Sequence, residues 1–173
     1  MIRSYRGVHP QIAPHCFIEE SAQVIGDVAV GEHSSIWFNS VVRGDVNRIT
    51  IGHHTNIQDL CMVHVTRDLF ATRIGNYVSI GHGVIVHGCT IEDNCLIGMG
   101  ARIMDDVVVG RESIVAAGAV ITSGLKIPPR SLVAGVPAII KRKLNDQDVE
   151  FINKFWKNYL EYKEIYLSEQ SPT

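Results

Sequence analysis

Between Ile91 and Ile139 the chain reads IEDNCLIGMGARIMDDVVVGRESIVAAGAVITSGLKIPPRSLVAGVPAI, with Ile or Val at every sixth position. The same spacing recurs upstream in three shorter runs that begin at Ile12, Ile51 and Ile74. A small side chain follows four places after most of these positions. This hexapeptide repeat predicts an all-β solenoid, in which three hexapeptides form one triangular coil with Ile or Val pointing inward. An ordinary β-sandwich is the alternative, but its side chains repeat every two residues.

The composition agrees with a chain that is mostly extended. The sequence of 173 residues contains 21 Ile and 20 Val but only 8 Leu. β-Branched side chains lose rotamer freedom in helices and pack well on pleated surfaces. Residues 12–143 therefore hold about seven stacked coils. An interruption at about residues 67–73, RDLFATR, predicts a short loop that leaves the prism.

The C-terminal segment changes to a helical period. Asn145 is a candidate N-cap, and Asp146 and Asp148 suit the positive end of a helix. Apolar side chains then recur near helical spacing at Val149, Ile152, Phe155, Trp156, Tyr159 and Ile165. We expect a β-helix domain over residues 1–144, a helix packed on it over 145–168, and a tail over 169–173. The core of the helix is predicted at about 146–167.

Charge and cysteine usage limit the partners and the compartment. The net charge is −2, which gives no general electrostatic reason to expect nucleic acid or an anionic membrane. No apolar run approaches the roughly 20 residues needed to span a bilayer, and the N-terminus lacks the apolar stretch of a signal peptide. The four cysteines form no CxxC pair and suit reduced thiols. These features predict a cytoplasmic protein.

Repeat phase places two histidines in one column. His64 and His87 each follow an inward-pointing Val, so they occupy the same place in successive coils, about 4.8 Å apart. Arg43 stands one coil earlier in that column. His82 precedes His87 by about 16 Å of extended chain. If His82 is a third ligand of the same ion, it must come from a neighbouring subunit. Three prisms around a threefold axis would give a homotrimer with a metal site at each subunit interface.

A set of three histidines suits a metal of catalytic type. Neutral imidazole binds Zn²⁺, and three such ligands leave the fourth position open for water. Fe²⁺ and Co²⁺ are compatible with the same donors. The alternative is a set of surface histidines that the repeat happens to align.

Several motifs combine with the repeat. VVRGD at 41–45, NIQD at 56–59, His64, GHxxxxHG at 81–88 and GVPA at 135–138 together resemble the gamma-class carbonic anhydrase family over nearly the whole chain. The resemblance implies a trimer of left-handed parallel β-helices, each with a C-terminal helix. It also implies that His64 and His87 of one subunit and His82 of the next bind zinc, iron or cobalt.

The resemblance suggests roles for further residues. It implies that Arg43 and Asp45 tie subunits together beside the site, although a plain interface salt bridge is the alternative. Gln58 resembles the residue that hydrogen-bonds the attacking hydroxide or the bicarbonate. Asn56 and Asp59 resemble supporting positions, and Asp59 shares a column with His82. Tyr159 is a further candidate for reaching the site, with packing on the prism as the alternative.

The function that the resemblance implies is reversible hydration of CO₂ to bicarbonate by metal-bound hydroxide. Two proton-moving glutamates of well-characterised members have no counterpart here. The loop after His64 is short and carries only Asp68, and Val46 follows Asp45. Slow turnover limited by proton transfer is therefore expected if the protein is active. The alternatives are an acyl-CoA-dependent acyltransferase or thioesterase of the hexapeptide-repeat superfamily, and a non-catalytic metal-binding trimer.

Overall fold

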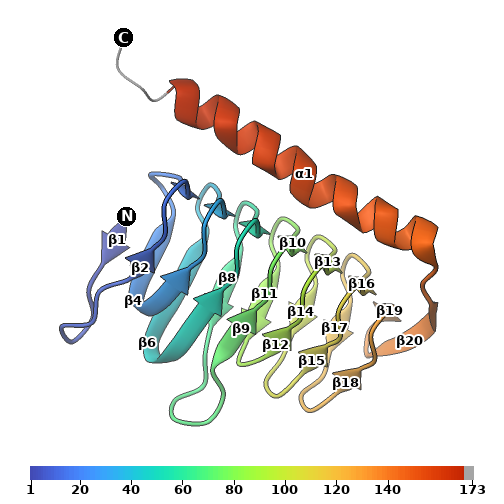
Figure 1. Cartoon of the computed structure of the whole chain (residues 1–173). Helices are drawn as coiled ribbons and strands as arrows, with labels where there is room; N and C mark the ends of the chain where they lie inside the picture. The colour runs from blue at the N-terminus through green and yellow to red at the C-terminus, as the bar shows by residue number, and fades with distance from the viewer. Residues whose placement is uncertain (170–173) are drawn as a thin grey trace.

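The computed structural model describes residues 1–169, which wind into a parallel β-helix with one helix along its side (Figure 1). The strands of this part of the chain form two sheets. The larger sheet contains β1 (Ile2–Arg3), β2 (Gln11–Ile12), β4 (Gln23–Val30), β6 (Val41–Ile51), β8 (Met62–His64), β9 (Thr72–Ile74), β11 (Ile85–His87), β12 (Thr90–Ile91), β14 (Arg102–Ile103), β15 (Val108–Val109), β17 (Val120–Ile121) and β18 (Lys126–Ile127). The smaller sheet contains β3 (Phe17–Ile18), β5 (Ser35–Ile36), β7 (Asn56–Ile57), β10 (Ser79–Ile80), β13 (Leu96–Ile97), β16 (Ile114–Val115), β19 (Ser131–Gly135) and β20 (Ala138–Lys143).

The two sheets make the three sides of a prism. The long strand β6 pairs with β8 through its first half and with β9 through its second half. One side, here called the histidine face, therefore continues through β8, β11, β14 and β17, and the next through β9, β12, β15 and β18. The third side, the helix face, is the parallel stack from β3 to β19. Over residues 1–169 this stack has seven parallel strands, one for each coil, as the repeat predicts.

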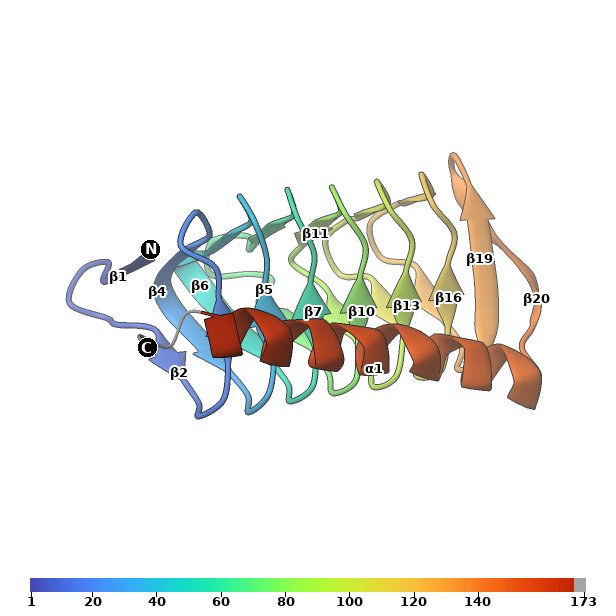
Figure 2. The ribbon, with the colours of Figure 1, turned by 90° about the horizontal axis from the view of Figure 1, so that it is seen from above.

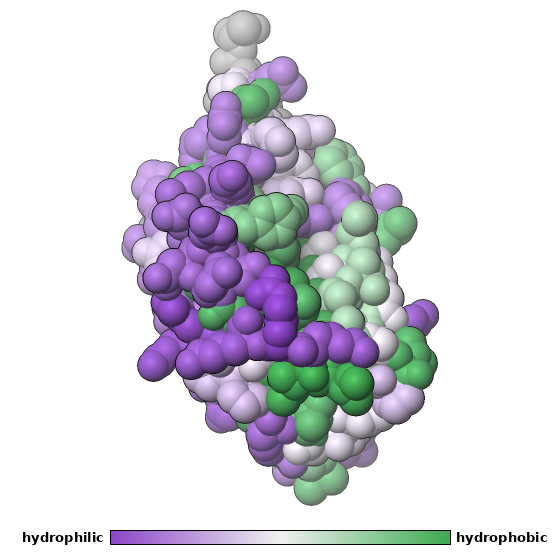
Figure 3. Space-filling model, turned by 90° about the vertical axis from the view of Figure 1, so that its right-hand side faces the viewer, coloured by the Kyte–Doolittle hydropathy of each residue, from purple (hydrophilic) through white to green (hydrophobic). Residues whose placement is uncertain are grey.

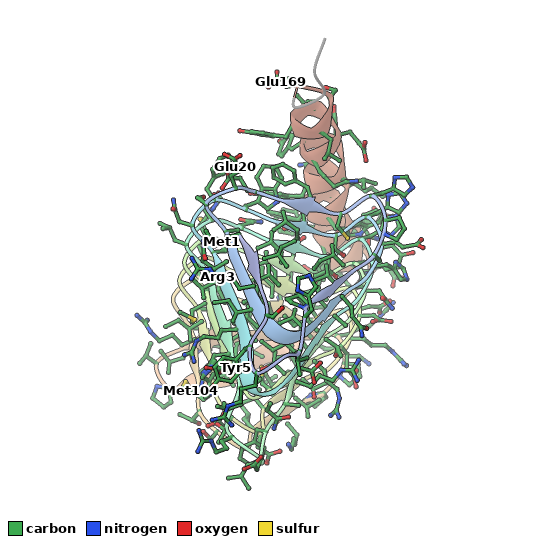
Figure 4. All side chains as sticks on the ribbon, turned by 90° about the vertical axis from the view of Figure 1, so that its left-hand side faces the viewer. Met1, Arg3, Tyr5, Glu20, Met104 and Glu169 are labelled. Carbon is green, nitrogen blue, oxygen red and sulfur yellow. The ribbon has the colours of Figure 1, made fainter. Side chains whose placement is uncertain are left out.

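The Ile and Val columns form the core. Val63, Val86 and Ile103 stand in register on three neighbouring coils, and each is fully buried. One coil alone could not enclose such side chains, so burial requires stacking. Viewed along the axis from the N-terminal coil, the strands outline a tube filled with side chains (Figure 4). The predicted parallel β-helix is confirmed.

The repeat ends one step earlier than its phase predicts. Val133 is buried, but Ile139, six residues later, is 56% exposed. The prediction that Ile139 points inward is wrong, because β20 turns back and pairs antiparallel with β19 instead of starting another coil. Exposed Val136 and Ile140 lie in the same hairpin. Apolar side chains are visible on this C-terminal end of the prism (Figure 3).

A short loop leaves the prism between β8 and β9, where the repeat is interrupted. Its ends approach each other through the bridge between Thr66 and Phe70, whose backbone hydrogen bond measures 3.0 Å. Arg67, Asp68 and Leu69 at its tip are exposed. This loop follows closely on His64, the last residue of β8.

Helix α1 (Asp146–Glu169) returns along the helix face toward the N-terminal coil (Figure 2). Asn145 and Asp148 cap it reciprocally, since the Asp148 amide donates to Asn145 Oδ1 and the Asn145 amide to Asp148 Oδ2. Ile152 is fully buried, as expected. Ile165, the last position of the apolar recurrence, is 49% exposed, and the fully buried side chain near it is that of Lys163. The predicted tail lies outside the described residues, apart from Glu169, which ends the helix.

Two further observations concern the chain as a whole. All four cysteines are free thiols. Helix α1 is the one helix among residues 1–169, and it is not apolar enough to cross a membrane.

Candidate metal centre

His64 and His87 end strands β8 and β11 and stand in register on the histidine face. Their ring centroids are 5.2 Å apart, and His64 Nδ1 lies 3.2 Å from His87 Nε2. Arg43 precedes them in the same column, because Val42 pairs with Val63 directly before it. The parallel register thus brings together the side chains that the six-residue phase places in one column.

A carboxylate lies behind each of these two imidazoles. His64 Nε2 is 3.0 Å from Asp45 Oδ1, and His87 Nδ1 is 2.8 Å from Asp105 Oδ1. An ionised carboxylate only accepts hydrogen bonds, so each imidazole donates through the nitrogen that faces its carboxylate. In neutral imidazoles the remaining nitrogens, His64 Nδ1 and His87 Nε2, then carry lone pairs that point toward one another.

Two lone pairs 3.2 Å apart require a cation or a proton between them. Two imidazole ligands on a tetrahedral ion, each at about 2.0–2.1 Å, have nitrogens about 3.3 Å apart. The observed separation fits that geometry. Carboxylates behind the opposite ring nitrogens are also the usual support of metal-binding histidines. The donor set of this column therefore fits a divalent transition metal.

Arg43 and Asp45 form an ion pair beside this column. Burial opposes ionisation of Asp45, but hydrogen bonds from His64 and Arg43 outweigh it and hold the pKa of the carboxyl below its ordinary value. Asp45 is thus an anion at neutral pH. The Asp45 carboxylate accepts one hydrogen bond from His64 and one from the Arg43 guanidinium. The Arg43 side chain is partly exposed at the edge of the site.

His82 belongs to a second group, at the corner between β10 and β11. Its Nδ1 lies 2.6 Å from Asp59 Oδ2, and its Nε2 lies 3.4 Å from the Tyr159 hydroxyl of α1. Burial, with the charge of Asp59 nearby, raises the pKa of Tyr159 to about 12, so its hydroxyl remains a donor. The His82 side chain is itself 44% exposed. Another molecule could therefore reach the His82 side chain.

Asn56 and Gln58 lie on the helix face next to this second group. Gln58 Nε2 donates to Asn56 Oδ1 at 3.2 Å, and Asn56 Nδ2 donates to Ser79 Oγ at 2.9 Å. Both amides are buried. Gln58 also lines a groove of 530 Å³ between α1 and the helix face, together with His82 and Tyr159. The rest of that groove is largely apolar, with Phe151, Phe155, Tyr162, Leu96 and Ile114 among its lining residues.

The predicted site residues therefore fall into two half-sites on one chain. Arg43, Asp45, His64 and His87 form the first, and Asn56, Gln58, Asp59, His82 and Tyr159 form the second. Over residues 1–169, no three His, Cys, Asp or Glu side chains converge in a way that could hold a metal ion. A single chain supplies two of the three predicted ligands to one place.

Sequence reasoning missed Asp105 and Thr66. Asp105 accepts from the Thr66 hydroxyl at 2.9 Å as well as from His87. A signal for Asp105 was present, because it follows His87 by eighteen residues, which is one coil. Thr66 carries no such signal, since it lies in the loop that interrupts the repeat.

Known proteins similar to this chain agree with the repeat and with the motifs. The family model for bacterial transferase hexapeptides (six repeats) matches residues 71–103 and 88–123. The carbonic anhydrase of Geobacillus kaustophilus is 39% identical over 170 residues, covering 98% of this chain and 93% of that protein. The mitochondrial gamma carbonic anhydrase 2 of Arabidopsis thaliana is 42% identical over 167 residues, or 94% of this chain. This chain spans only 60% of that plant protein.

A solved structure is similar over the whole length. A Bacillus cereus protein, described only provisionally as an acetyltransferase, superposes with a TM-score of 0.95 at 39% identity, covering 98% of each chain. Relatives with this fold thus carry names from two enzyme classes, and the fold alone does not decide between them.

Proposed function

This chain belongs to the gamma carbonic anhydrase family, and from that premise we propose that it binds a divalent metal and catalyses the reversible hydration of CO₂ to bicarbonate. One observation carries the proposal: His64 Nδ1 and His87 Nε2 face each other at 3.2 Å, and a carboxylate lies behind each ring. Surface histidines aligned only by the repeat would need neither carboxylate.

His64 and His87 would hold the metal from one chain, and His82 of a second copy would complete the set. The 44% exposure of the His82 side chain supports this arrangement. The Tyr159 hydroxyl, which lies 3.4 Å from His82 Nε2, would turn away from that nitrogen when it binds the ion. In a homotrimer with three such interfaces, every copy would contribute His64 and His87 to one metal site and His82 to another. Zinc is the proposed ion, although Fe²⁺ and Co²⁺ suit the same donors and metal availability decides between them.

When bound, such an ion supplies Lewis acidity that lowers the pKa of a water to about 7. The residues of the chain do the rest. Asp45 and Asp105 hold two imidazoles in the tautomers that expose the binding nitrogens. The Arg43 guanidinium offers positive charge to the bicarbonate anion. The Gln58 amide can orient a substrate oxygen by donating a hydrogen bond.

Proton release is expected to be the slow step of the proposed reaction. Asp45 and Asp105 are both engaged by histidines, and the loop after His64 carries its carboxyl, Asp68, at an exposed tip. Val46 occupies the place after Asp45. We therefore expect slow turnover that buffer molecules accelerate by accepting the proton.

Metal content and native mass test the proposal. Wild type, His82→Ala and the control His9→Ala are purified anaerobically and analysed by metal mass spectrometry. We expect about one metal per chain in a trimer for wild type and for the control, and loss of metal in His82→Ala. A protein that stays metal-free after zinc and iron are offered would contradict the metal-dependent function. Metal without CO₂ hydration, even with added buffer, would indicate a structural trimer.

Acyl-CoA chemistry is the second candidate, and the 530 Å³ groove favours it. The groove is lined by His82, whose imidazole could act as a base, and by aromatic side chains of α1. The similar Bacillus cereus structure, described provisionally as an acetyltransferase, also supports this candidate. Titration with acetyl-CoA by calorimetry separates the two candidates. Binding by metal-free protein, lost in Phe155→Ala, would support acyl-CoA chemistry, and indifference to acetyl-CoA would exclude it.

A further inference from the structure

Asp105 is the acceptor behind His87, and nothing in the family motifs quoted above includes it. His87 Nδ1 donates to Asp105 Oδ1 at 2.8 Å. Building on the proposed metal site, we infer that Asp105, held by Thr66, is a positioning residue that fixes His87 with Nε2 toward the ion. Asp105 itself does not touch the metal or the substrate.

The Thr66 hydroxyl fixes the carboxylate. Thr66 Oγ1 donates to the same oxygen, Asp105 Oδ1, at 2.9 Å. Thr66 is in turn held by the turn to Phe70 and by Asn47, whose Nδ2 donates to the Thr66 carbonyl at 3.2 Å. Asp105 therefore receives two hydrogen bonds from groups whose own positions are determined. Such support is what keeps a ligand ring in one rotamer and one tautomer.

Gly88 makes room for this arrangement. It follows His87 directly and has a φ of +53°, in the left-handed region. A Cβ at Gly88 would lie 2.1 Å from Asp105 Oδ1 and 2.9 Å from Phe70 Cβ. Any larger residue would push the carboxylate away from His87 or displace the loop. The close approach of the three groups thus depends on glycine at this position.

The other end of the loop is tied to the other ligand. Thr72, at the start of β9, donates its hydroxyl to the His64 carbonyl at 2.6 Å. Thr66 and Thr72 flank residues 67–71, so the short loop is attached to both histidines of the column. In this inference the role of the short loop is to hold His64 and His87 in place rather than to carry protons.

Cobalt binding tests the inference without reliance on activity. Metal-free trimers of wild type, Thr66→Val, Thr66→Ser and Asp105→Asn are titrated with Co²⁺ while its visible absorption is followed. We expect Thr66→Val and Asp105→Asn to bind Co²⁺ about 10-fold to 100-fold more weakly than wild type. Thr66→Ser keeps the hydroxyl and should restore the affinity. Asp106→Asn, at the exposed neighbour that pairs with Lys126, should leave it unchanged.

The outcomes separate this inference from the proposed function. If wild type binds no Co²⁺, the metal site and the role of Asp105 both fail. If wild type binds but Thr66→Val and Asp105→Asn match Asp106→Asn, the role of Asp105 alone is overturned. A purely structural role would lower the melting temperature of these variants without changing the affinity of the folded trimer. Should Asp105→Asn not fold, the pair Thr66→Val and Thr66→Ser still decides the question.

Discussion

The ammonium group of Lys163, near the end of α1, donates a hydrogen bond of 2.9 Å to the carbonyl of His15 in the first coil. The Lys163 side chain is fully buried, and its Nζ also lies 2.5 Å from Glu164 Oε1. A helix that begins at the last coil is thereby attached to the first. This bond attaches the C-terminal part of α1 to the first coil, so the helix extends across the helix face and borders the groove that contains Gln58 and His82.

Lys163→Met should destabilise the protein. Methionine keeps most of the aliphatic stem but leaves the His15 carbonyl without its donor, which costs about 1–3 kcal/mol for a buried acceptor. Urea unfolding at a fixed protein concentration measures the change. Lys154→Met on the exposed side of α1 is the matched control. Equal midpoints for the two variants would show that the buried ammonium does not stabilise the docked helix.

Histidines stack on successive coils beside the same helix. The rings of His15 and His33 are parallel within 10° at 5.0 Å, and His33 lies 4.9 Å from His54. Burial lowers the pKa of His54, and repulsion from His33, His53 and Lys163 lowers it further, against the opposing effect of Glu32.

Stability should therefore fall on acidification near neutrality. The unfolded chain protonates this imidazole near its ordinary pKa of about 6.5, whereas the folded protein does so only at lower pH. The stabilising contribution of neutral His54 is present above pH ~6.5 and is lost as the pH falls below it. Melting temperatures of metal-free His54→Gln should decline less steeply below pH ~6.5 than those of wild type. His9→Gln, at an exposed position, should keep the wild-type slope.

The sequence predicts the repeating parts of this structure well and the exceptions poorly. Val63 and Val86 could be placed because a fixed period assigns every sixth side chain to the core. Ile139 obeys the period but lies in an antiparallel strand, since the last hairpin closes the prism. Lys163 was missed because a buried ammonium depends on a carbonyl 148 residues away.

The residues of the candidate site also divide into those that the repeat predicts and those that it does not. The column of Arg43, His64 and His87 follows from the register of strands, so the repeat phase locates it. Thr66 lies in a loop outside the phase, and its bond to Asp105 depends on how that loop folds back. The third predicted ligand, His82, does not meet the pair within residues 1–169. Contacts between copies of the chain are not encoded in the repeat phase of one copy.

Asn145→Ala tests the local signal that starts α1. The Asn145 side chain accepts from the Asp148 amide at 3.0 Å, and its loss should cost about 1 kcal/mol, within a range of about 0.5–2 kcal/mol. Asn145→Ser retains a capping oxygen and should recover most of this loss. Urea unfolding followed by circular dichroism measures both variants. If alanine and serine are equivalent at this position, the cap contributes nothing to the stability of the folded protein.

Val46→Glu tests whether proton transfer limits the proposed reaction. Val46 follows Asp45 in β6, and its partly buried side chain packs against the core. The longer glutamate side chain can extend beyond that contact toward Asp45, whose carboxylate is already engaged by His64 and Arg43. A carboxylate at position 46 would add a proton acceptor that is not engaged by a histidine. A positioned general acid or base contributes about 10²–10⁴-fold to the rate of a catalysed reaction, so hydration at low buffer should rise by about 10²-fold.

The dependence on buffer distinguishes this explanation from a general change in the site. Wild-type rates should increase with imidazole concentration, since the buffer accepts the proton, and Val46→Glu should be nearly independent of it. The glutamine of Val46→Gln has nearly the shape of glutamate but no titratable group, so this variant should behave as wild type does. Stopped-flow CO₂ hydration at several buffer concentrations measures all three proteins. Wild-type rates that do not respond to buffer would show that a step other than proton release limits turnover.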